Sequence, residues 1–263
     1  MLRSSLDRIR IGLAPNRVDL ARLRIGRGTR PVAETSVTCE RRPGEAPWQA
    51  ALDALEHALP DFAPGGGSAT VVLSNAFVRY LVVPWQPEIS GVRELDELAS
   101  LRFSRTFGEA AAGWTIRCSA GGYGEPALAC ALDTALVEAL TGKLRACKLR
   151  LVSLQPLLMA AYNDVRRQLA PTHVFATVEV DRLCVSIMGQ GHWRHVVSRR
   201  GSADPAEVIE QELSALGSEA PPAEIDVLLV GDGVAWPEDI ACAARLLGRP
   251  EERGVSLALR GVA

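Results

Sequence analysis

The apolar pattern of the chain runs through one order of elements twice, and few folds are compatible with such a repeat. Three predicted strands are followed by a helix, a strand, a helix and a strand. The first copy of this β-β-β-α-β-α-β order is interrupted by a β-α-β-β unit. A repeat this long predicts two similar α/β lobes around a cleft. We expect a first lobe from 1–76 with 134–170, an inserted subdomain from 77–133 and a second lobe from 171–263.

The first copy opens with three short strands. Arg8–Ile11 alternates charged and apolar residues, as a half-buried strand does, and Pro15-Asn16 then turns the chain. The apolar phase slips near Ala21, which predicts a β-bulge there. A helix follows from Pro47 and is predicted to end at Pro60, because proline is compatible with the first turn of a helix and disrupts its interior.

The insert and the second copy can be delimited in the same way. Within the insert we expect a strand over 78–84, a helix over 92–106 and a hairpin of 114–120 with 127–133. The turn of that hairpin is glycine-rich, Gly121–Gly124. In the second copy, strands are predicted over 173–180, 183–188, 193–198, 225–230 and 255–259, and helices over 205–216 and 237–247.

Composition narrows the class of protein. The chain has 263 residues, of which 48% are hydrophobic and 23% charged, and this composition is typical of a globular protein. With 29 basic and 31 acidic residues it has no basic excess, so we expect no nucleic-acid partner. No signal peptide and no apolar stretch of about 18 residues is visible, which indicates a cytoplasmic protein.

Neither catalytic nor metal-binding patterns stand out. Gly65–Gly67 follows a predicted helix and opens a strand, whereas a phosphate loop follows a strand and opens a helix. The six cysteines are scattered without a C-x-x-C pair, which favours free thiols. His192 and His195 lie three apart on a predicted strand, so their rings point to opposite faces. We therefore predict no catalytic residue and no metal site.

The first 42 residues are rich in arginine. They contain ten arginines against four acidic residues. The absence of interleaved aromatic residues argues against single-stranded nucleic acid. A polar face of the sheet, or a docking site for an acidic partner that involves Arg22 and Arg24, fits this pattern better.

Three segments resemble one known family. They are Ser74–Pro84, Ala131–Val137 and Lys148–Pro156. Together with the order of elements, they are similar to PilM and to the cytoplasmic part of GspL, which belong to the actin-like superfamily. The resemblance implies duplicated actin-like (ribonuclease H-like) lobes with an inserted β-α-β-β subdomain. It spans nearly the whole chain and depends on order and apolar pattern more than on rare residues.

The resemblance also indicates where a nucleotide would bind. In the first phosphate loop, Gly12 stands where actin-like proteins have an aspartate, Ala14 where they have a glycine, and Asp19 where PilM usually has a lysine. In the second loop, Thr177 and Glu179 take the aspartate and glycine positions. An acidic side chain in such a loop repels a triphosphate.

Only the adenosine-side loop retains partial likeness to the family. It contains Gly231 and Gly233, the candidate cofactor-binding residues, although a simple strand-to-helix turn would also need glycine. With two of three loops altered, the sequence predicts neither ATP hydrolysis nor a bound cofactor.

The family implies a non-catalytic cytoplasmic scaffold, peripheral to the inner membrane, in a bacterial type II secretion or type IV pilus platform. Its implied partners are the assembly ATPase and a membrane protein of PilN or GspM type, and a homodimer is possible. A nucleotide-binding actin-like ATPase or small-molecule kinase is the alternative. The choice between secretion and pilus systems stays open, as does whether the chain is a whole protein or the excised part of a membrane protein.

Overall fold

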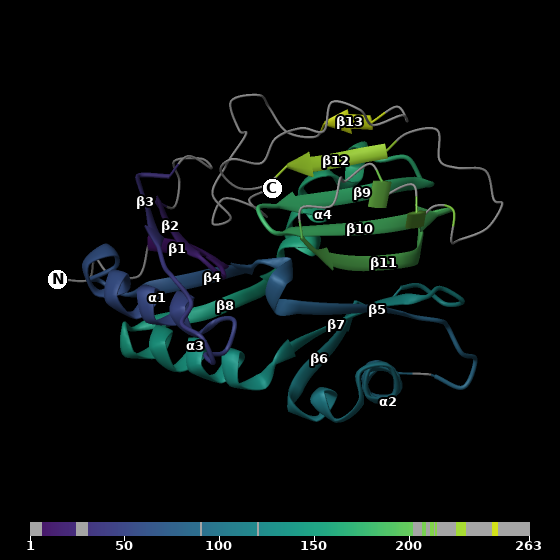
Figure 1. The fold of residues 1–263 in the computed structure, drawn as a ribbon, viewed down its shortest axis with the longest axis horizontal. Helices are drawn as coiled ribbons and strands as arrows, with labels where there is room; N and C mark the ends of the chain where they lie inside the picture. The colour runs from purple at the N-terminus through teal and green to yellow at the C-terminus, as the bar shows by residue number, and fades with distance from the viewer. Residues whose placement is uncertain are drawn as a thin grey trace. The chain divides into compact units, whose positions relative to one another are not determined.

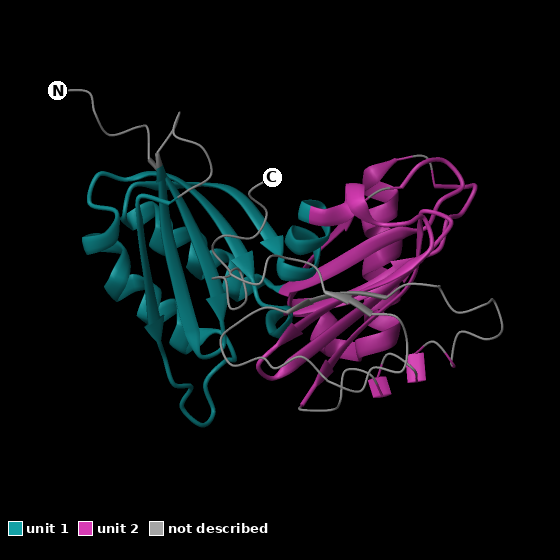
Figure 2. Cartoon of the chain, turned by 90° about the horizontal axis from the view of Figure 1, so that it is seen from above, with its two compact units in different colours: residues 1–77, 133–164, 255–263 teal, residues 78–132, 165–254 magenta. Residues whose placement is uncertain are grey.

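The computed structural model describes residues 7–24, 31–89, 91–119, 121–201, 207–208, 211–212, 214, 225–229 and 244–246 (Figure 1). The chain divides into two compact units (Figure 2). Unit 1 comprises Met1–Phe77, Asp133–Asp164 and Val255–Ala263, and unit 2 comprises Val78–Leu132 and Val165–Gly254. Within the described ranges, no helix combines the length and the apolar character needed to cross a membrane.

Unit 1 contains a five-stranded sheet in the order β3-β2-β1-β4-β8. Its first three strands form an antiparallel meander, and β4 and β8 run parallel to β1. The strands are β1 (Asp7–Ala14), β2 (Arg17–Arg24), β3 (Ala33–Thr38), β4 (Gly67–Leu73) and β8 (Leu149–Pro156).

The bulge expected near Ala21 is absent, since β1 and β2 pair without a break from Asp7↔Arg24 to Ala14↔Arg17. Leu20 and Ala21 are instead both buried, because both faces of β2 are covered at this point. The apparent slip in the apolar pattern therefore marks burial on two sides.

Two helices cover one face of this sheet. In Figure 1, α1 (Gln49–Phe62) and α3 (Thr134–Ala146) lie side by side beneath it. Their contact faces repeat leucine every three or four residues, the spacing that places side chains on one side of a helix. These buried leucines are Leu52, Leu55, Leu59, Leu136, Leu140 and Leu144.

The predicted end of α1 was wrong, because the helix continues past Pro60 to Phe62. Proline removes the N–H that would reach the carbonyl of Glu56 and crowds that carbonyl, but it disrupts little here because this position lies in the last turn. The amide of Ala63 donates to the carbonyl of Leu59 at 2.9 Å and closes the helix. After β8, the chain continues into α4 (Leu157–Val165) and a short 3₁₀ turn, η3 (Arg166–Gln168).

The glycine connector Gly65–Gly67 leads directly into β4, as predicted. Gly66 has φ +68°, and a Cβ there would lie 2.7 Å from the carbonyl oxygen of Lys148. Only glycine combines this backbone conformation with such a close approach to a neighbouring strand.

Polar side chains of unit 1 hold both ends of the insert. On the entry side lies η1 (Asn75–Phe77), where the Oδ1 of buried Asn75 accepts from the amide of Leu158 at 3.2 Å. On the exit side, Asp133 accepts from the amide of Ala135 at 2.9 Å and from the Trp48 indole at 3.0 Å. Asp133 therefore caps α3 and holds the start of α1 at once.

A five-stranded sheet in unit 2 repeats the strand order of the sheet in unit 1. Its order is β11-β10-β9-β12-β13, with an antiparallel meander followed by two parallel strands. The strands are β9 (His173–Glu179), β10 (Arg182–Gly189), β11 (His192–Arg200), β12 (Ile225–Leu229) and β13 (Ala244–Leu246). The same order and the same directions in both sheets confirm the predicted duplication.

The helix predicted over 237–247 was wrong at its end, where β13 pairs in parallel with β12. The segment is a nearly continuous apolar run, and such a run does not distinguish a buried helix from a buried strand. The fifth strand of the sheet is thus 244–246, and the strand predicted over 255–259 lies outside the described residues.

The insert has the predicted β-α-β-β order. It consists of β5 (Val78–Val83), α2 (Val92–Phe107), a 3₁₀ turn η2 (Gly108–Gly113), β6 (Trp114–Ser119) and β7 (Ala127–Asp133), with sheet order β5-β7-β6. Helix α2 packs on one face of this sheet around Phe103, whose ring lies 6.2 Å from that of Trp114. The other face is also buried, through Tyr80 and Leu128. That the insert folds as a separate subdomain remains a prediction.

Candidate functional site

The first candidate site is the hairpin of β1 and β2, where actin-like proteins hold phosphates. Gly12 lies directly opposite Asp19, and Asp19 lies directly opposite Ser36 on β3. Residues opposite one another share a face of the sheet, so the Asp19 side chain lies on the face of Gly12. Asp19 is only 3% exposed.

A compact polar network surrounds the Asp19 carboxylate. The Nε of Arg17 and the hydroxyl of Ser36 each donate to its Oδ1 at 2.6 Å. The same Arg17 Nε lies 2.7 Å from the Ser36 hydroxyl. These donors are the groups that could otherwise bind a phosphate, and they are used within the sheet. The hairpin is a closed ion pair rather than an anion cradle.

The second hairpin, between β9 and β10, does not form a phosphate cradle either. Thr177 is fully buried in the sheet, and Glu179 ends β9 opposite Arg182. The turn itself exposes Val180, which is 63% accessible. The third loop, with Gly231 and Gly233, lies outside the described residues, so its role as a cofactor-binding loop stays a prediction.

The two histidines of β11 contact different acids. A bulge places Arg194 between the pairs Met188↔Trp193 and Ile187↔His195. His192 lies 3.7 Å from Glu125, and His195 lies 2.9 Å from Glu212. In the parts of the chain that the structure describes, no three His, Cys, Asp or Glu side chains gather as metal ligands would.

Glu212 belongs to a second polar network. Its Oε1 accepts from Arg199 at 2.6 Å and its Oε2 faces His195. Burial alone would raise the pKa of Glu212, but the hydrogen bonds from Arg199 and His195 outweigh it and lower that pKa. The carboxylate is therefore charged and doubly partnered at neutral pH.

The arginines of the opening strands contact their own unit. Arg22 is half-buried, with its guanidinium 6.0 Å from the centre of the Phe62 ring. Burial lowers the pKa of Arg10, while Asp164 acts in the opposite direction. Arg17 is paired with Asp19. A surface role for Arg22 and Arg24 in docking an acidic partner remains a prediction, and the side chain of Arg24 lies outside the described part of the structure.

The cysteines do not provide a nucleophile in the insert. Burial raises the pKa of Cys118 to about 12, and the nearby Asp96 adds to the effect. Burial likewise raises the pKa of Cys130 to about 11. Both thiols therefore stay protonated at neutral pH, and the thiolate is the reactive form.

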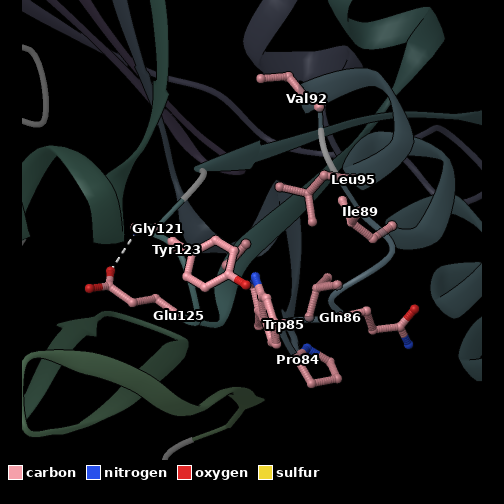
Figure 3. A pocket seen from close by; sticks show the side chains of 13 residues that line it. Pro84, Trp85, Gln86, Ile89, Val92, Leu95, Gly121, Tyr123 and Glu125 are labelled. Atoms are coloured by element: carbon pink, nitrogen blue, oxygen red, sulfur yellow. Dashed lines mark hydrogen bonds between the residues drawn. The ribbon is translucent and has the colours of Figure 1, made fainter.

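The insert carries an apolar pocket that the sequence did not reveal. It has a volume of about 250 Å³ and lies between the segment after β5, the start of α2 and the β6–β7 turn (Figure 3). Trp85, Ile89 and Leu95 line it from the first two of these elements, and Tyr123 lines it from the third. The Trp85 and Tyr123 rings meet edge to face with centroids 5.0 Å apart. We call this site the Trp85–Tyr123 pocket.

The turn that carries Tyr123 is braced from within. The amide of Gly122 donates to Oε2 of Glu125 at 2.6 Å. A Cβ on Gly121 would lie 2.9 Å from the Glu125 side chain, and one on Gly122 would lie 3.0 Å from it. Gly124 adopts φ +82°. The glycines therefore let the turn wrap around Glu125, and this leaves the Tyr123 side chain at the surface, 92% exposed.

Comparison with solved structures identifies the fold. The cytoplasmic domain of EpsL, an inner membrane component of the type II secretion system of Vibrio cholerae, matches with a TM-score of 0.62 and 13% identity over 96% of this chain and 92% of that one. A chain of a PilM–PilN type IV pilus biogenesis complex matches equally, with a TM-score of 0.62 and 13% identity over 97% and 91%.

A third similar structure is a Bacteroides thetaiotaomicron protein with an actin-like ATPase fold and unknown function. It gives a TM-score of 0.60 and 13% identity over 87% of this chain and 83% of that one. No protein-family model matches the sequence, and no curated protein does. The predicted actin-like fold is confirmed.

Proposed function

We propose that the chain is a non-catalytic scaffold on the cytoplasmic side of a bacterial inner membrane, in a type II secretion or type IV pilus platform. There it links the assembly ATPase to a membrane partner of PilN or GspM type. Two of the similar folds support the proposal, one an inner membrane component of a secretion system and the other from a PilM–PilN complex.

The observation that carries the non-catalytic part is the state of the first hairpin. Actin-like phosphate loops use an aspartate for metal-bound water and a glycine for close backbone approach. Here glycine and alanine occupy those positions, and the acid opposite Gly12, Asp19, is buried and bonded to Arg17 and Ser36. The residues that would orient a nucleotide for hydrolysis are thus replaced or used elsewhere.

Calorimetry with ATP and magnesium tests this part. We expect a dissociation constant weaker than about 10 μM, which corresponds to about −7 kcal/mol. Tight, magnesium-dependent binding would instead support the alternative, a nucleotide-binding ATPase or small-molecule kinase. Adding the family lysine by Asp19→Lys should not create ATP affinity, because the aspartate expected at Gly12 would still be missing.

The scaffold part needs a separate measurement. The purified full chain should bind the assembly ATPase of the same bacterium, with or without ATP. A pull-down that recovers neither this ATPase nor a membrane partner of PilN or GspM type would contradict the assignment. The genes that flank its own gene supply an independent check, since platform components are expected in one cluster.

A further inference from the structure

The Trp85–Tyr123 pocket groups exposed and half-exposed apolar side chains at one place on the insert. Tyr123 is 92% exposed and Val92, at the start of α2, is 63% exposed. Both line the same pocket as the half-buried Trp85 and Ile89 (Figure 3). Aromatic side chains grouped in this way are enriched where proteins bind one another.

The size of the pocket indicates what it can hold. Its volume of about 250 Å³ lies below the range of roughly 300–1,000 Å³ typical of small-molecule sites. A pocket of this size fits one bulky side chain of a protein partner better than a drug-sized ligand. Because the bond from Gly122 to Glu125 already orders the Tyr123 turn, little conformational entropy is lost when a partner binds.

The charges around the pocket indicate the sign of that partner. Glu125 lines the pocket, and the exposed Glu88 and Glu94 are next in the chain to the lining residues Ile89 and Leu95. Two basic side chains lie among these acids: Arg93 is 3.1 Å from Glu97, and His192 is 3.7 Å from Glu125. Glu94 also suits the positive end of the α2 dipole, but Glu88 and Glu125 lie outside the helix. The border of the pocket is therefore acidic around an apolar centre.

We propose that the Trp85–Tyr123 pocket docks a basic segment of a partner protein, which inserts one aromatic or leucine side chain against Trp85, Ile89 and Tyr123. Flanking lysines or arginines of that segment lie over Glu88 and Glu125. The proposal deepens the scaffold function and rests on it, since it names the surface and the chemistry by which one partner is held.

A random library of 12-residue peptides, selected on the full chain, provides the probe. The selected peptides should share one bulky apolar residue with basic neighbours. For the tightest of them, measured by fluorescence anisotropy, Tyr123→Ser should weaken binding at least about tenfold, which is about 1.4 kcal/mol. Val92→Ser should weaken it about threefold. Glu88→Lys should weaken it at 50 mM salt and much less at 0.5 M, where screening is strong.

Val180→Ser is the matched control. Val180 is a valine of the same 63% exposure as Val92 and does not line the pocket, so its replacement should leave the affinity unchanged. An acidic consensus, equal binding to Tyr123→Ser, or no peptide tighter than about 100 μM would overturn the proposal. So would self-association of the chain that Tyr123→Ser abolishes, because the occupant would then be a second copy.

The peptide result and the scaffold function can fail separately. If the assembly ATPase and the membrane partner bind while the peptides bind elsewhere, only the pocket assignment is wrong. If the peptides bind as expected and neither platform protein does, the pocket is a docking site in a protein of another role.

Discussion

The first hairpin and the Trp85–Tyr123 pocket differ in how their side chains are covered and paired. In the hairpin, a buried carboxylate, a guanidinium and a hydroxyl bond one another within 2.7 Å, and the acid is 3% exposed. In the pocket, a tyrosine that is 92% exposed and a valine that is 63% exposed face solvent with little cover. The polar side chains of the hairpin, where actin-like proteins bind phosphates, thus have hydrogen-bond partners within the protein. The apolar side chains of the pocket on the insert are exposed to solvent.

This difference indicates where a ligand would gain free energy. A phosphate at the hairpin would have to displace the bonds among Asp19, Arg17 and Ser36, and leaving such a buried carboxylate unpaired is costly. An apolar side chain at the pocket would displace only water, and it would gain about 25 cal/mol for each Å² of apolar surface removed from it. We therefore expect a partner to bind at the pocket on the insert, and the polar network of the hairpin to contribute to folding stability.

The largest effect is expected for Asp19→Ala, which should lower the free energy of unfolding by about 2–3 kcal/mol. The substitution leaves Arg17 and Ser36 without the acceptor that they share. Urea unfolding at pH 7 measures the loss.

Ser36→Ala is the matched control for this change. It removes one donor from an exposed position and should cost about 1 kcal/mol or less. If Asp19→Ala proved as stable as the natural chain and gained magnesium-dependent ATP affinity, the hairpin would be a binding site. The contrast drawn between the hairpin and the pocket would then be wrong.

Much of the architecture is legible in the sequence. Strict alternation located β1, and apolar runs bounded by turns located β5 and β7 almost to the residue. Local patterns failed where burial was two-sided or a run was uniformly apolar, as at Ala21 in β2 and at 244–246 in β13. At Ala21 the deciding factor was burial of both faces of β2, and at 244–246 it was the pairing with β12. A local pattern contains neither piece of information.

The pocket could not be predicted in the same way. Trp85 and Tyr123 are distant in the sequence, and they meet because β7 returns between β5 and β6. One local signal was available, a large aromatic residue in a turn otherwise made of glycine. A hairpin turn needs no aromatic residue, so Tyr123 pointed to a role other than chain reversal.

The network around Glu212 tests whether a second set of paired polar side chains stabilises the fold, as we expect for the first hairpin. Glu212→Gln should cost about 1–2 kcal/mol at pH 7, because two charge-assisted hydrogen bonds are weakened. The pKa of Glu212 is lowered in the folded state, so its contribution is present above the ordinary carboxyl pKa and is lost as pH falls through the lower folded value.

The difference between the natural chain and Glu212→Gln should therefore shrink when unfolding is followed from pH 7 down to about pH 3. Glu207→Gln serves as the control, since Glu207 is exposed on the same segment. A difference that stays constant over this range would mean that the charge of Glu212 contributes nothing to stability.

The smallest change in stability is expected at the Trp85–Tyr123 pocket, and it separates a binding role from a folding role most clearly. Tyr123→Ser should change the free energy of unfolding by less than about 0.5 kcal/mol, because a side chain that is 92% exposed gains little from folding. Its edge contact with Trp85 is the part that could add to this figure. Val180→Ser, in the turn between β9 and β10, should behave alike in the same urea titration. A loss above 1.5 kcal/mol for Tyr123→Ser alone would show that the tyrosine holds the insert together, and a weakened peptide affinity could then no longer be assigned to the pocket. A near-zero change joined to a tenfold loss of peptide binding would separate the two roles, with folding carried by the core around Phe103 and recognition by the surface around Tyr123.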